Sequence, residues 1–200
     1  MRLYRCLMAS ILLLFSFSVM AQTSPVPMLE NVAQKILVTL KNNKSELKKN
    51  PEIIRSAVQR YLLPVVDTRG MARSVLGRQA WNKATPAERD QFIRAFTKLV
   101  IRTYANPLAE YTDETIQFLP IRGSVDSRFL RVNSVIKRSN GQNVPLSYSL
   151  VSKGANWKIY DLSVEGVSLL QSFRSQFAQA LQSSSMKKLI EQLEKKASAA

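Results

Sequence analysis

The 200-residue chain contains no histidine, and its single cysteine, Cys6, lies close to the N-terminus. These two residue types carry most nucleophilic, acid–base and transition-metal chemistry near neutral pH. Their scarcity argues against histidine-activated nucleophiles and histidine–cysteine metal sites. It also excludes internal disulfides, so the fold must be held together by packing alone. There is no glycine-rich phosphate loop, and we expect no catalytic residues, no metal and no cofactor.

Charge is absent from residues 6–20, an apolar run that two arginines precede. Small residues stand at the two cleavage-determining positions that end at Ala21, which is the pattern of a secretory signal. A transmembrane anchor is the alternative, but the run is shorter than the ~20 residues that a spanning helix needs. We predict that residues 1–21 are a cleaved signal peptide and that an exported protein begins at Gln22.

Acidic residues are few: 14 Asp and Glu stand against 29 Lys and Arg, a formal net charge of +15. Without the two arginines of the signal segment, 27 basic and 14 acidic residues remain, a net +13. Such an excess favours nucleic acid, an anionic membrane surface or an acidic protein as partner. Export makes nucleic acid the least suitable of these, and we expect no nucleic-acid partner. A purely solubilising role of the charge is the alternative.

The apolar pattern divides residues 22–200 into three parts of one domain. Residues 22–113 have mostly helical spacing, residues 114–165 alternate with a period of two, and residues 166–195 return to helical spacing. This order predicts an α+β fold: a mainly helical N-terminal half, a four-stranded antiparallel twisted meander packed on helices, and C-terminal helices.

Three shorter helices are predicted in the N-terminal half. The first is a helical stripe over residues 28–40, and Pro51 stands in the first helical position of the second, which ends before Pro64. Asp67 or its neighbour should cap the third helix, and Gly77 should end it.

A longer helix begins at Thr85. The segment Thr85-Pro-Ala-Glu88 is a capping box, in which the two side chains satisfy each other's backbone N–H groups. The helix should run to near Tyr111, with Pro107 kinking it. Its apolar residues cover more than the single stripe of a surface helix, which predicts a central position.

Four strands joined by tight turns are predicted after this helix, and Asn140-Gly141 is the strongest hairpin signal among the turns. A one-residue slip would invert the face of a strand. The alternating residues are Ile116 and Phe118; Leu130, Val132 and Ile136; Val144, Leu146, Tyr148 and Leu150; and Tyr160, Leu162 and Val164.

Two features could be interpreted as catalytic. The segment around Ser168 lacks the second glycine of a lipase-type G-x-S-x-G motif, and no histidine could activate this serine. Asp161 and Glu165 could form an acid–base pair, but four residues at a strand end have no predictable geometry. We expect Asp161 to pair with an arginine or a backbone N–H, and Glu165 to lie near a helix N-terminus.

Two long motifs stand out in the exported chain. The first is Asp67-Thr-Arg-Gly-Met-Ala-Arg-Ser-Val-Leu-Gly77, followed by Trp81, the segment Ala84-Thr-Pro-Ala-Glu-Arg89, Phe92, Phe96, Leu99 and Thr103-Tyr104. The second is Trp157-Lys-Ile-Tyr-Asp-Leu-Ser-Val-Glu-Gly-Val-Ser-Leu-Leu-Gln-Ser-Phe-Arg-Ser-Gln-Phe177. In these motifs the chain resembles the MlaC family, also known as toluene-tolerance or auxiliary-transport proteins. Phe173 stands where tyrosine is expected, and Glu88 stands where glutamine is usual.

The resemblance implies a monomeric periplasmic carrier that shuttles phospholipid between the two membranes of a Gram-negative envelope and maintains outer-membrane lipid asymmetry. It implies a lipid cavity between the sheet and the helices, with the headgroup at solvent. The implied partners are phospholipid, an inner-membrane ABC transporter complex of the Mla type and an outer-membrane lipoprotein–porin complex. Such a carrier needs no enzyme activity.

The physics of acyl chains agrees with a deep apolar cavity. Burying one methylene is worth about 0.8 kcal/mol, so about thirty methylenes resist crossing water by roughly 20 kcal/mol or more. We expect the cavity between the long helix and the inner face of the meander. Its predicted lining is Met71, Val75, Phe92, Phe96, Val100, Tyr104, Leu130, Val132, Tyr148, Leu150, Leu169 and Phe173.

Partner docking is predicted at the turn around Gly166 and Val167, where we also expect the mouth of the cavity. Basic residues should assist through salt-sensitive attraction to acidic surfaces. The candidates are Arg122, Arg128, Arg131, Lys137 and Arg138 around the first hairpin, with Lys187 and Lys188 near the C-terminus. For any one of them a merely solvated position is the alternative.

Two other functions remain open from the sequence. One is a basic periplasmic chaperone or adaptor that binds exported polypeptides at the membrane. The other is a lipid hydrolase that uses Ser168 or a carboxylate.

Overall fold

The computed structural model describes residues 23–198, so the predicted signal peptide and its cleavage site lie outside the described residues. The helices are α1 (Val26–Asn42), α2 (Glu52–Ala57), α3 (Thr68–Lys83), α4 (Pro86–Ala109), α5 (Leu169–Ser183) and α6 (Met186–Ser198). The strands are β1 (Thr115–Phe118), β2 (Phe129–Lys137), β3 (Asn143–Lys153), β4 (Asn156–Val164) and β5 (Val167–Ser168). The predicted α+β fold class is confirmed. Within residues 23–198, no helix is both long and apolar enough to cross a bilayer.

The strands form one antiparallel sheet in the order β1-β2-β3-β4-β5. The four predicted strands are present, and β5 is a short addition. We predicted that the last long helix begins near Val167, but this residue pairs with Val164 of β4. The turn between them is made by Glu165 and Gly166, whose φ angles of 50° and 83° reverse the chain before α5 begins.

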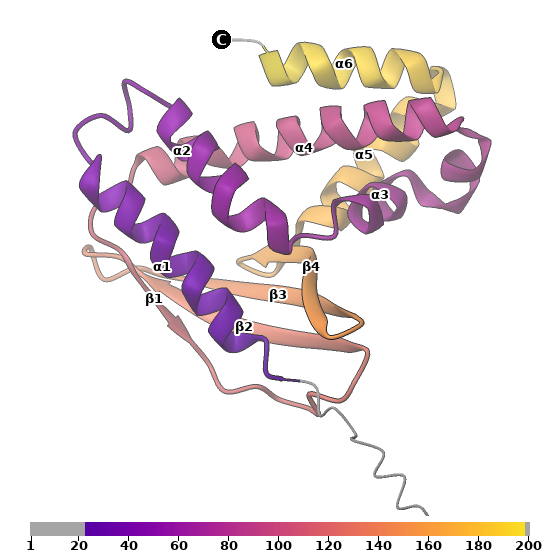
Figure 1. Cartoon of the computed structure of the whole chain (residues 1–200). Helices are drawn as coiled ribbons and strands as arrows, with labels where there is room; N and C mark the ends of the chain where they lie inside the picture. Colours follow the sequence, from indigo (N-terminus) through magenta and orange to yellow (C-terminus); the bar gives the residue numbers. More distant parts are fainter. Residues whose placement is uncertain (1–22, 199–200) are drawn as a thin grey trace, which may run out of the picture.

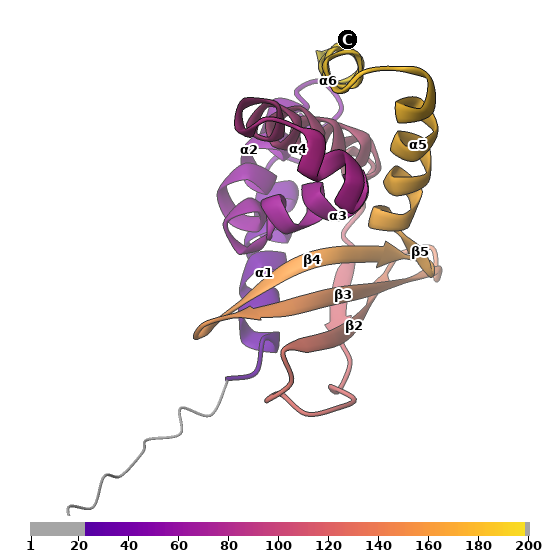
Figure 2. The same ribbon diagram turned by 90° about the vertical axis from the view of Figure 1, so that its right-hand side faces the viewer.

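The helices gather on one side of the sheet (Figures 1 and 2). Helix α1 lies against the sheet and contacts β1, whereas α3 and α5 contact β4. Helix α5 rises from the end of β5 and leads to α6, which packs along α4. The sheet therefore has a helix-covered face and an outer face.

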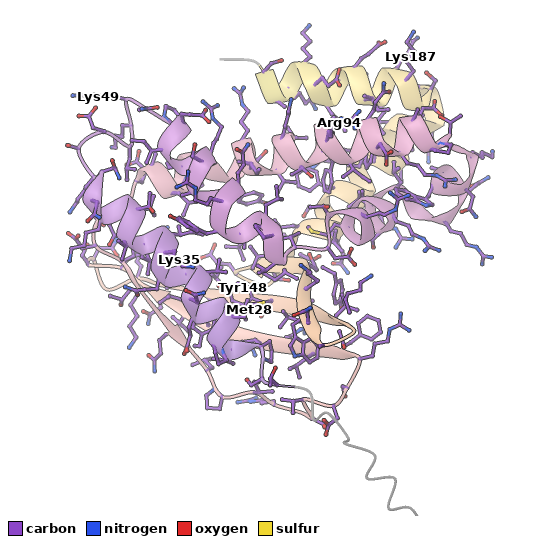
Figure 3. The ribbon with its side chains drawn as sticks, viewed as in Figure 1. Met28, Lys35, Lys49, Arg94, Tyr148 and Lys187 are labelled. Carbon is purple, nitrogen blue, oxygen red and sulfur yellow. The ribbon has the colours of Figure 1, made fainter. Side chains whose placement is uncertain are left out.

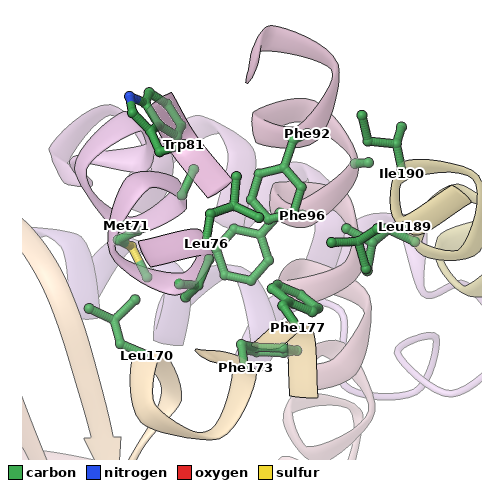
Figure 4. Close-up of a cluster of buried hydrophobic side chains, with 14 residues drawn as sticks. Met71, Leu76, Trp81, Phe92, Phe96, Leu170, Phe173, Phe177, Leu189 and Ile190 are labelled. Carbon is green, nitrogen blue, oxygen red and sulfur yellow. The ribbon is translucent and has the colours of Figure 1, made fainter. Parts of the chain in front are cut away.

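A packed hydrophobic cluster fills the space where α3, α4, α5 and α6 meet (Figure 4). At its centre the rings of Phe92 and Phe96 stack at 5.8 Å between centroids, and Phe173 meets Phe96 edge-on at 5.2 Å. Phe177 meets Phe92 edge-on at 5.6 Å. These are favoured aromatic geometries, and they hold the C-terminal helices on α4.

A β-bulge in β4 changes which residues face the helices. Ser149 pairs with Asp161, but Leu150 pairs with Ile159, so Tyr160 has no partner on β3. An extra residue shifts the alternation by one. We predicted that Tyr160, Leu162 and Val164 share one face of the strand. For Tyr160 this prediction is wrong, and its ring packs edge-on against Phe129 at 5.8 Å.

The start of α1 is attached to the beginning of β4. The indole N–H of Trp157 donates to the Thr23 carbonyl at 2.8 Å, and Leu29 is buried in the cluster that contains Trp157. Both contacts join segments that lie more than a hundred residues apart in the sequence. The N-terminal helix is therefore positioned by β4.

The predicted helix signals are present in the structure. The Thr85 hydroxyl accepts from the Glu88 N–H at 3.2 Å, and Glu88 accepts from the Thr85 N–H at 2.8 Å, so the capping box is confirmed. Gly77 has a φ of 73° and interrupts the helical geometry of α3, as its position predicted. Pro107 lies inside α4, near its end.

Candidate ligand cavity

A cavity of about 430 Å³ lies between the helices and the sheet. Three walls enclose it, formed by α1, by the segment from the π-helical turn to α4, and by the sheet. Its apolar lining includes Leu29, Val32, Ile36 and Leu40 of α1; Val58, Leu62 and Leu63; Phe96, Val100, Ile101 and Leu108 of α4; and Ile136, Val144, Leu146, Ile159, Leu162 and Val164 of the sheet.

Helix α1 supplies one complete wall. Its lining residues recur three or four positions apart, which places them on one face of the helix. Charged side chains such as Lys49 in the α1–α2 connection, Arg94 of α4 and Lys187 of α6 point outward instead (Figure 3). This stripe was identified in the sequence, but we did not predict that it faces a cavity. A stripe that faces a void has the same spacing as one that faces a packed core, so the sequence carries no signal that separates them.

Irregular helical turns shape a second wall. The chain is π-helical at Val58–Leu62 and 3₁₀-helical at Leu63–Val65. Pro64 lacks a backbone N–H, which favours an interruption of regular α-helical bonding here. The wider π-turn rotates the following side chains relative to an α-helix, and Val58, Leu62 and Leu63 all reach the cavity.

The interior of the cavity is uncharged. Its sheet wall carries Tyr148, which lies behind α1 near Met28 (Figure 3). Burial raises the pKa of Tyr148, and burial likewise raises the pKa of Tyr104 on α4. Both hydroxyls therefore stay protonated near neutral pH. The Tyr148 oxygen accepts from the Ser134 hydroxyl at 3.4 Å, so this polar atom is satisfied within the sheet.

Four of the polar lining residues gather at one end of the cavity. They come from the end of α4, the start of β1 and the end of β2, and they are Tyr111, Glu114, Thr115 and Arg138. Thr115 and Arg138 are exposed, so this end opens to solvent. Residues 165–168, where we expected the mouth, are not part of the lining.

Two ion pairs border this mouth. Lys44 binds Asp113, and the Lys48 ammonium lies 2.8 Å from the Glu110 carboxylate. Both pairs join the connection between α1 and α2 to the segment that leaves α4. They are exposed, so each contributes little to the free energy of unfolding. They nevertheless place both signs of charge at the polar end of the cavity.

The twelve predicted lining residues divide into two equal groups. The structure places Met71, Phe96, Val100, Tyr104, Tyr148 and Leu169 in the cavity wall. It places Val75, Phe92 and Phe173 in the packed cluster of Figure 4, and Leu130, Val132 and Leu150 in the cluster around Trp157. The second group lies where α5, α6 or the start of α1 fills the space opposite. That the first group contacts lipid stays a prediction.

The predicted docking residues lie on the outer side of the molecule. Val167 is 60% exposed and Phe129 is 56% exposed. Arg131 and Gly166 border a polar hollow of about 320 Å³ on the outer face of the sheet. Arg128 lies over the Phe129 ring at 5.6 Å, and the exposed Arg122 lies in the same β1–β2 connection.

The residues considered for catalysis have structural partners. The buried Asp161 accepts from the Ser168 hydroxyl at 2.7 Å and from the Leu170 N–H at 3.1 Å. Ser168 in turn accepts from the Gln171 N–H at 3.1 Å. These bonds cap the N-terminus of α5. Glu165 is exposed in the turn and has no bond to Asp161 among the described residues.

Within residues 23–198, no three potential metal-binding side chains come together.

Comparison with known proteins agrees with this architecture. The model of the family described as MlaC protein matches residues 30–195. The chain is 31% identical over 168 residues to the toluene tolerance protein ttg2D of Pseudomonas putida, covering 84% of this chain and 78% of that protein. It is 30% identical over 182 residues to the intermembrane phospholipid transport system binding protein MlaC of Haemophilus influenzae, covering 89% and 84%.

A solved structure has the same fold. It is a phospholipid-binding protein from Ralstonia solanacearum in complex with a phospholipid, and it superposes with a TM-score of 0.80 at 25% sequence identity. The match covers 88% of this chain and 97% of that one. The cavity-forming elements α1, α4 and the sheet make up much of the described chain.

Proposed function

Because this chain belongs to the MlaC family, we propose that it carries phospholipid in the Mla pathway, with the acyl chains inside the cavity described above. The observation that carries the proposal is the apolar cavity of about 430 Å³ in a fold that matches a phospholipid-bound structure with a TM-score of 0.80.

The geometry of the cavity suits an amphipathic cargo. Each acyl methylene gains about 0.8 kcal/mol on leaving water, and the uncharged interior offers no competing polar site. The mouth is polar and open to solvent, so a headgroup there keeps its hydration. A single protein molecule can thus bury the acyl chains of a phospholipid and leave its headgroup hydrated.

The cellular setting follows from the same family. We propose that the chain acts in the periplasm after removal of residues 1–21 and moves lipid between the two membranes. The proposed partners are an inner-membrane ABC transporter complex and an outer-membrane lipoprotein–porin complex. Its exchange with both would maintain the lipid asymmetry of the outer membrane.

Partner docking is proposed at two exposed places on the sheet, the turn after β4 and the start of β2. Val167 is an exposed aliphatic side chain at the turn after β4, and Gly166 gives this turn its left-handed backbone. Arg122, Arg128 and Arg131 supply positive charge beside exposed Phe129. An exposed aromatic ring beside arginines suits a partner with an acidic surface.

Native mass spectrometry of the purified mature protein tests the carrier function. The expected spectrum shows the protein mass plus that of an intact phospholipid. A protein without lipid, recovered under conditions that preserve non-covalent complexes, would contradict the proposal. Bound polypeptide would favour the chaperone function instead, and bound lysophospholipid or fatty acid would favour the hydrolase.

A further inference from the structure

The mouth of the cavity contains one cationic lining residue, Arg138. Among residues 23–198 that line the cavity, all other side chains are apolar or neutral polar, except the acidic Glu114. Arg138 lies at the same end as the hydroxyl groups of Tyr111 and Thr115. Positive charge and hydroxyl donors thus meet at the point where the apolar interior reaches solvent.

The backbone of Arg138 is fixed, although its side chain is exposed. Its N–H donates to the Gln142 carbonyl at 3.0 Å, and its carbonyl accepts from the Gly141 N–H at 3.0 Å. These bonds close the hairpin between β2 and β3, with Gly141 in the left-handed region at a φ of 83°. The guanidinium is therefore carried on a rigid turn beside the mouth.

Arg138 is not neutralised by an acidic neighbour. Of the ion pairs formed among residues 23–198, none includes Arg138, whereas Lys44 and Lys48 at the same rim are both paired. The nearby Glu114 carboxylate is engaged locally, because it accepts from the Thr112 N–H at 2.7 Å and from the Thr112 hydroxyl at 3.1 Å. The guanidinium is thus the unpaired positive group of the mouth.

We propose that Arg138 binds the phosphate of the carried phospholipid. This inference rests on the proposed carrier function and names the group that recognises the headgroup. A guanidinium presents a planar fork of donors that matches two phosphate oxygens. Burial, together with the neighbouring Asp113 and Glu114, raises the pKa of Tyr111. Its hydroxyl therefore stays protonated and can act as a second donor to the phosphate.

The charge of the rim supports this role. Glu110, Asp113 and Glu114 would repel a lipid phosphate, and two of these carboxylates already have lysine partners. Arg138 offsets the repulsion at the place where the phosphate must lie if the acyl chains fill the cavity. Loss of its charge should weaken binding of phosphate-bearing lipids and leave binding of phosphate-free lipids unchanged.

A displacement assay on the full mature protein separates these effects. Delipidated protein is loaded with cis-parinaric acid methyl ester, an uncharged fluorescent reporter of the apolar cavity. The reporter is then displaced with dioleoylphosphatidylglycerol or with dioleoylglycerol, which has the same acyl chains and no phosphate. The variants are Arg138→Gln and Arg138→Lys, with Lys137→Gln as the matched control on the adjacent residue, which does not line the cavity.

Arg138→Gln should weaken displacement by dioleoylphosphatidylglycerol about five- to tenfold, the size expected for an exposed charge-assisted contact. Arg138→Lys should retain part of the affinity, since it keeps the charge and loses the fork. Binding of the reporter and of dioleoylglycerol should match the wild type in every variant, which also shows that the cavity is intact.

Equal displacement of the reporter from Arg138→Gln and wild type by dioleoylphosphatidylglycerol would overturn the inference. So would an equal loss for both lipids, because it would indicate a structural role of the arginine. An equal effect of Lys137→Gln would show general electrostatic attraction rather than a site. If the wild type binds neither lipid, the carrier function itself fails, and this result is distinct from the others.

Discussion

Helix α4 has two halves of similar composition with opposite surroundings. In its first half, Phe92 and Phe96 meet the phenylalanines of α5 in a packed cluster. In its second half, Val100, Tyr104 and Leu108 face the cavity. The difference comes from the opposite side: α5 supplies large rings and α6 supplies aliphatic side chains to the first half, whereas α1 and the curved sheet stand away from the second. Apolar composition therefore does not decide whether a region is packed or hollow.

The largest contrast between the packed cluster and the cavity wall should appear in stability. Phe92→Ala removes a fully buried ring and should lower the free energy of unfolding by about 3–5 kcal/mol. Leu162→Ala truncates a half-buried side chain in the cavity wall and should cost only about 1 kcal/mol. Urea denaturation of the delipidated proteins measures both. Equal losses would show that the cavity wall is packed as tightly as the cluster.

Lipid occupancy, unlike stability, should depend on the cavity wall more than on the packed cluster. Ile36→Glu places a carboxylate in the apolar wall of α1 and should reduce bound phospholipid tenfold or more, because acyl chains cannot compensate a buried charge. Val38→Glu is the matched control on the same helix, since Val38 is 43% exposed and does not line the cavity. The readout is native mass spectrometry of folded protein, verified by circular dichroism. Full occupancy in folded Ile36→Glu would place the lipid elsewhere.

Removal of lipid should affect the cavity region more than the packed cluster. A ligand that binds only the folded state at a hundred times its Kd adds about 2.7 kcal/mol, so delipidation should lower the melting temperature by several degrees. Hydrogen exchange should quicken mainly in α1, and little in α6, which packs on the cluster. An unchanged melting curve after verified delipidation would argue against an internal lipid.

The smallest effect on folding is expected outside both regions. Val167→Glu changes a side chain that is 60% exposed, so stability and bound lipid should stay as in the wild type. Transfer of lipid to the membrane complexes should nevertheless be blocked if the turn is the docking site. Val38→Glu again serves as control, being an exposed valine on another face. Full transfer activity of Val167→Glu would remove this turn from the interface.

Local signals in the sequence predicted much of the fold. The capping box at Thr85 depends only on neighbouring residues and is present, and Gly77 interrupts α3 as its type suggests, although the helix resumes and runs to Lys83. The alternation of Leu130 and Val132 predicted their shared inward face. The bulge at Tyr160 could not be read in this way, because an alternating strand and a bulged one contain the same kinds of residue.

The candidate site was less predictable than the fold. Of the predicted lining, Met71 and Val100 lie in the cavity wall, whereas Phe92 and Val132 pack against other elements. Which apolar residue faces a void depends on the distance to the opposite element, and that distance is a tertiary property. The mouth was missed because its polar residues come from three separate segments.

The attachment of α1 to Trp157 has a consequence for the order in which the chain folds as it is made. A chain that emerges from its N-terminus presents the α1 stripe first, while β4, which positions α1, emerges more than a hundred residues later. Until then α1 can contact only the segments that follow it directly, α2 and the π-helical turn, and its non-local contacts with the sheet form slowly. The wall of the cavity is therefore among the last parts of the molecule to close. Until it closes, the apolar face of α1 that lines the cavity is uncovered on the side that will face the sheet.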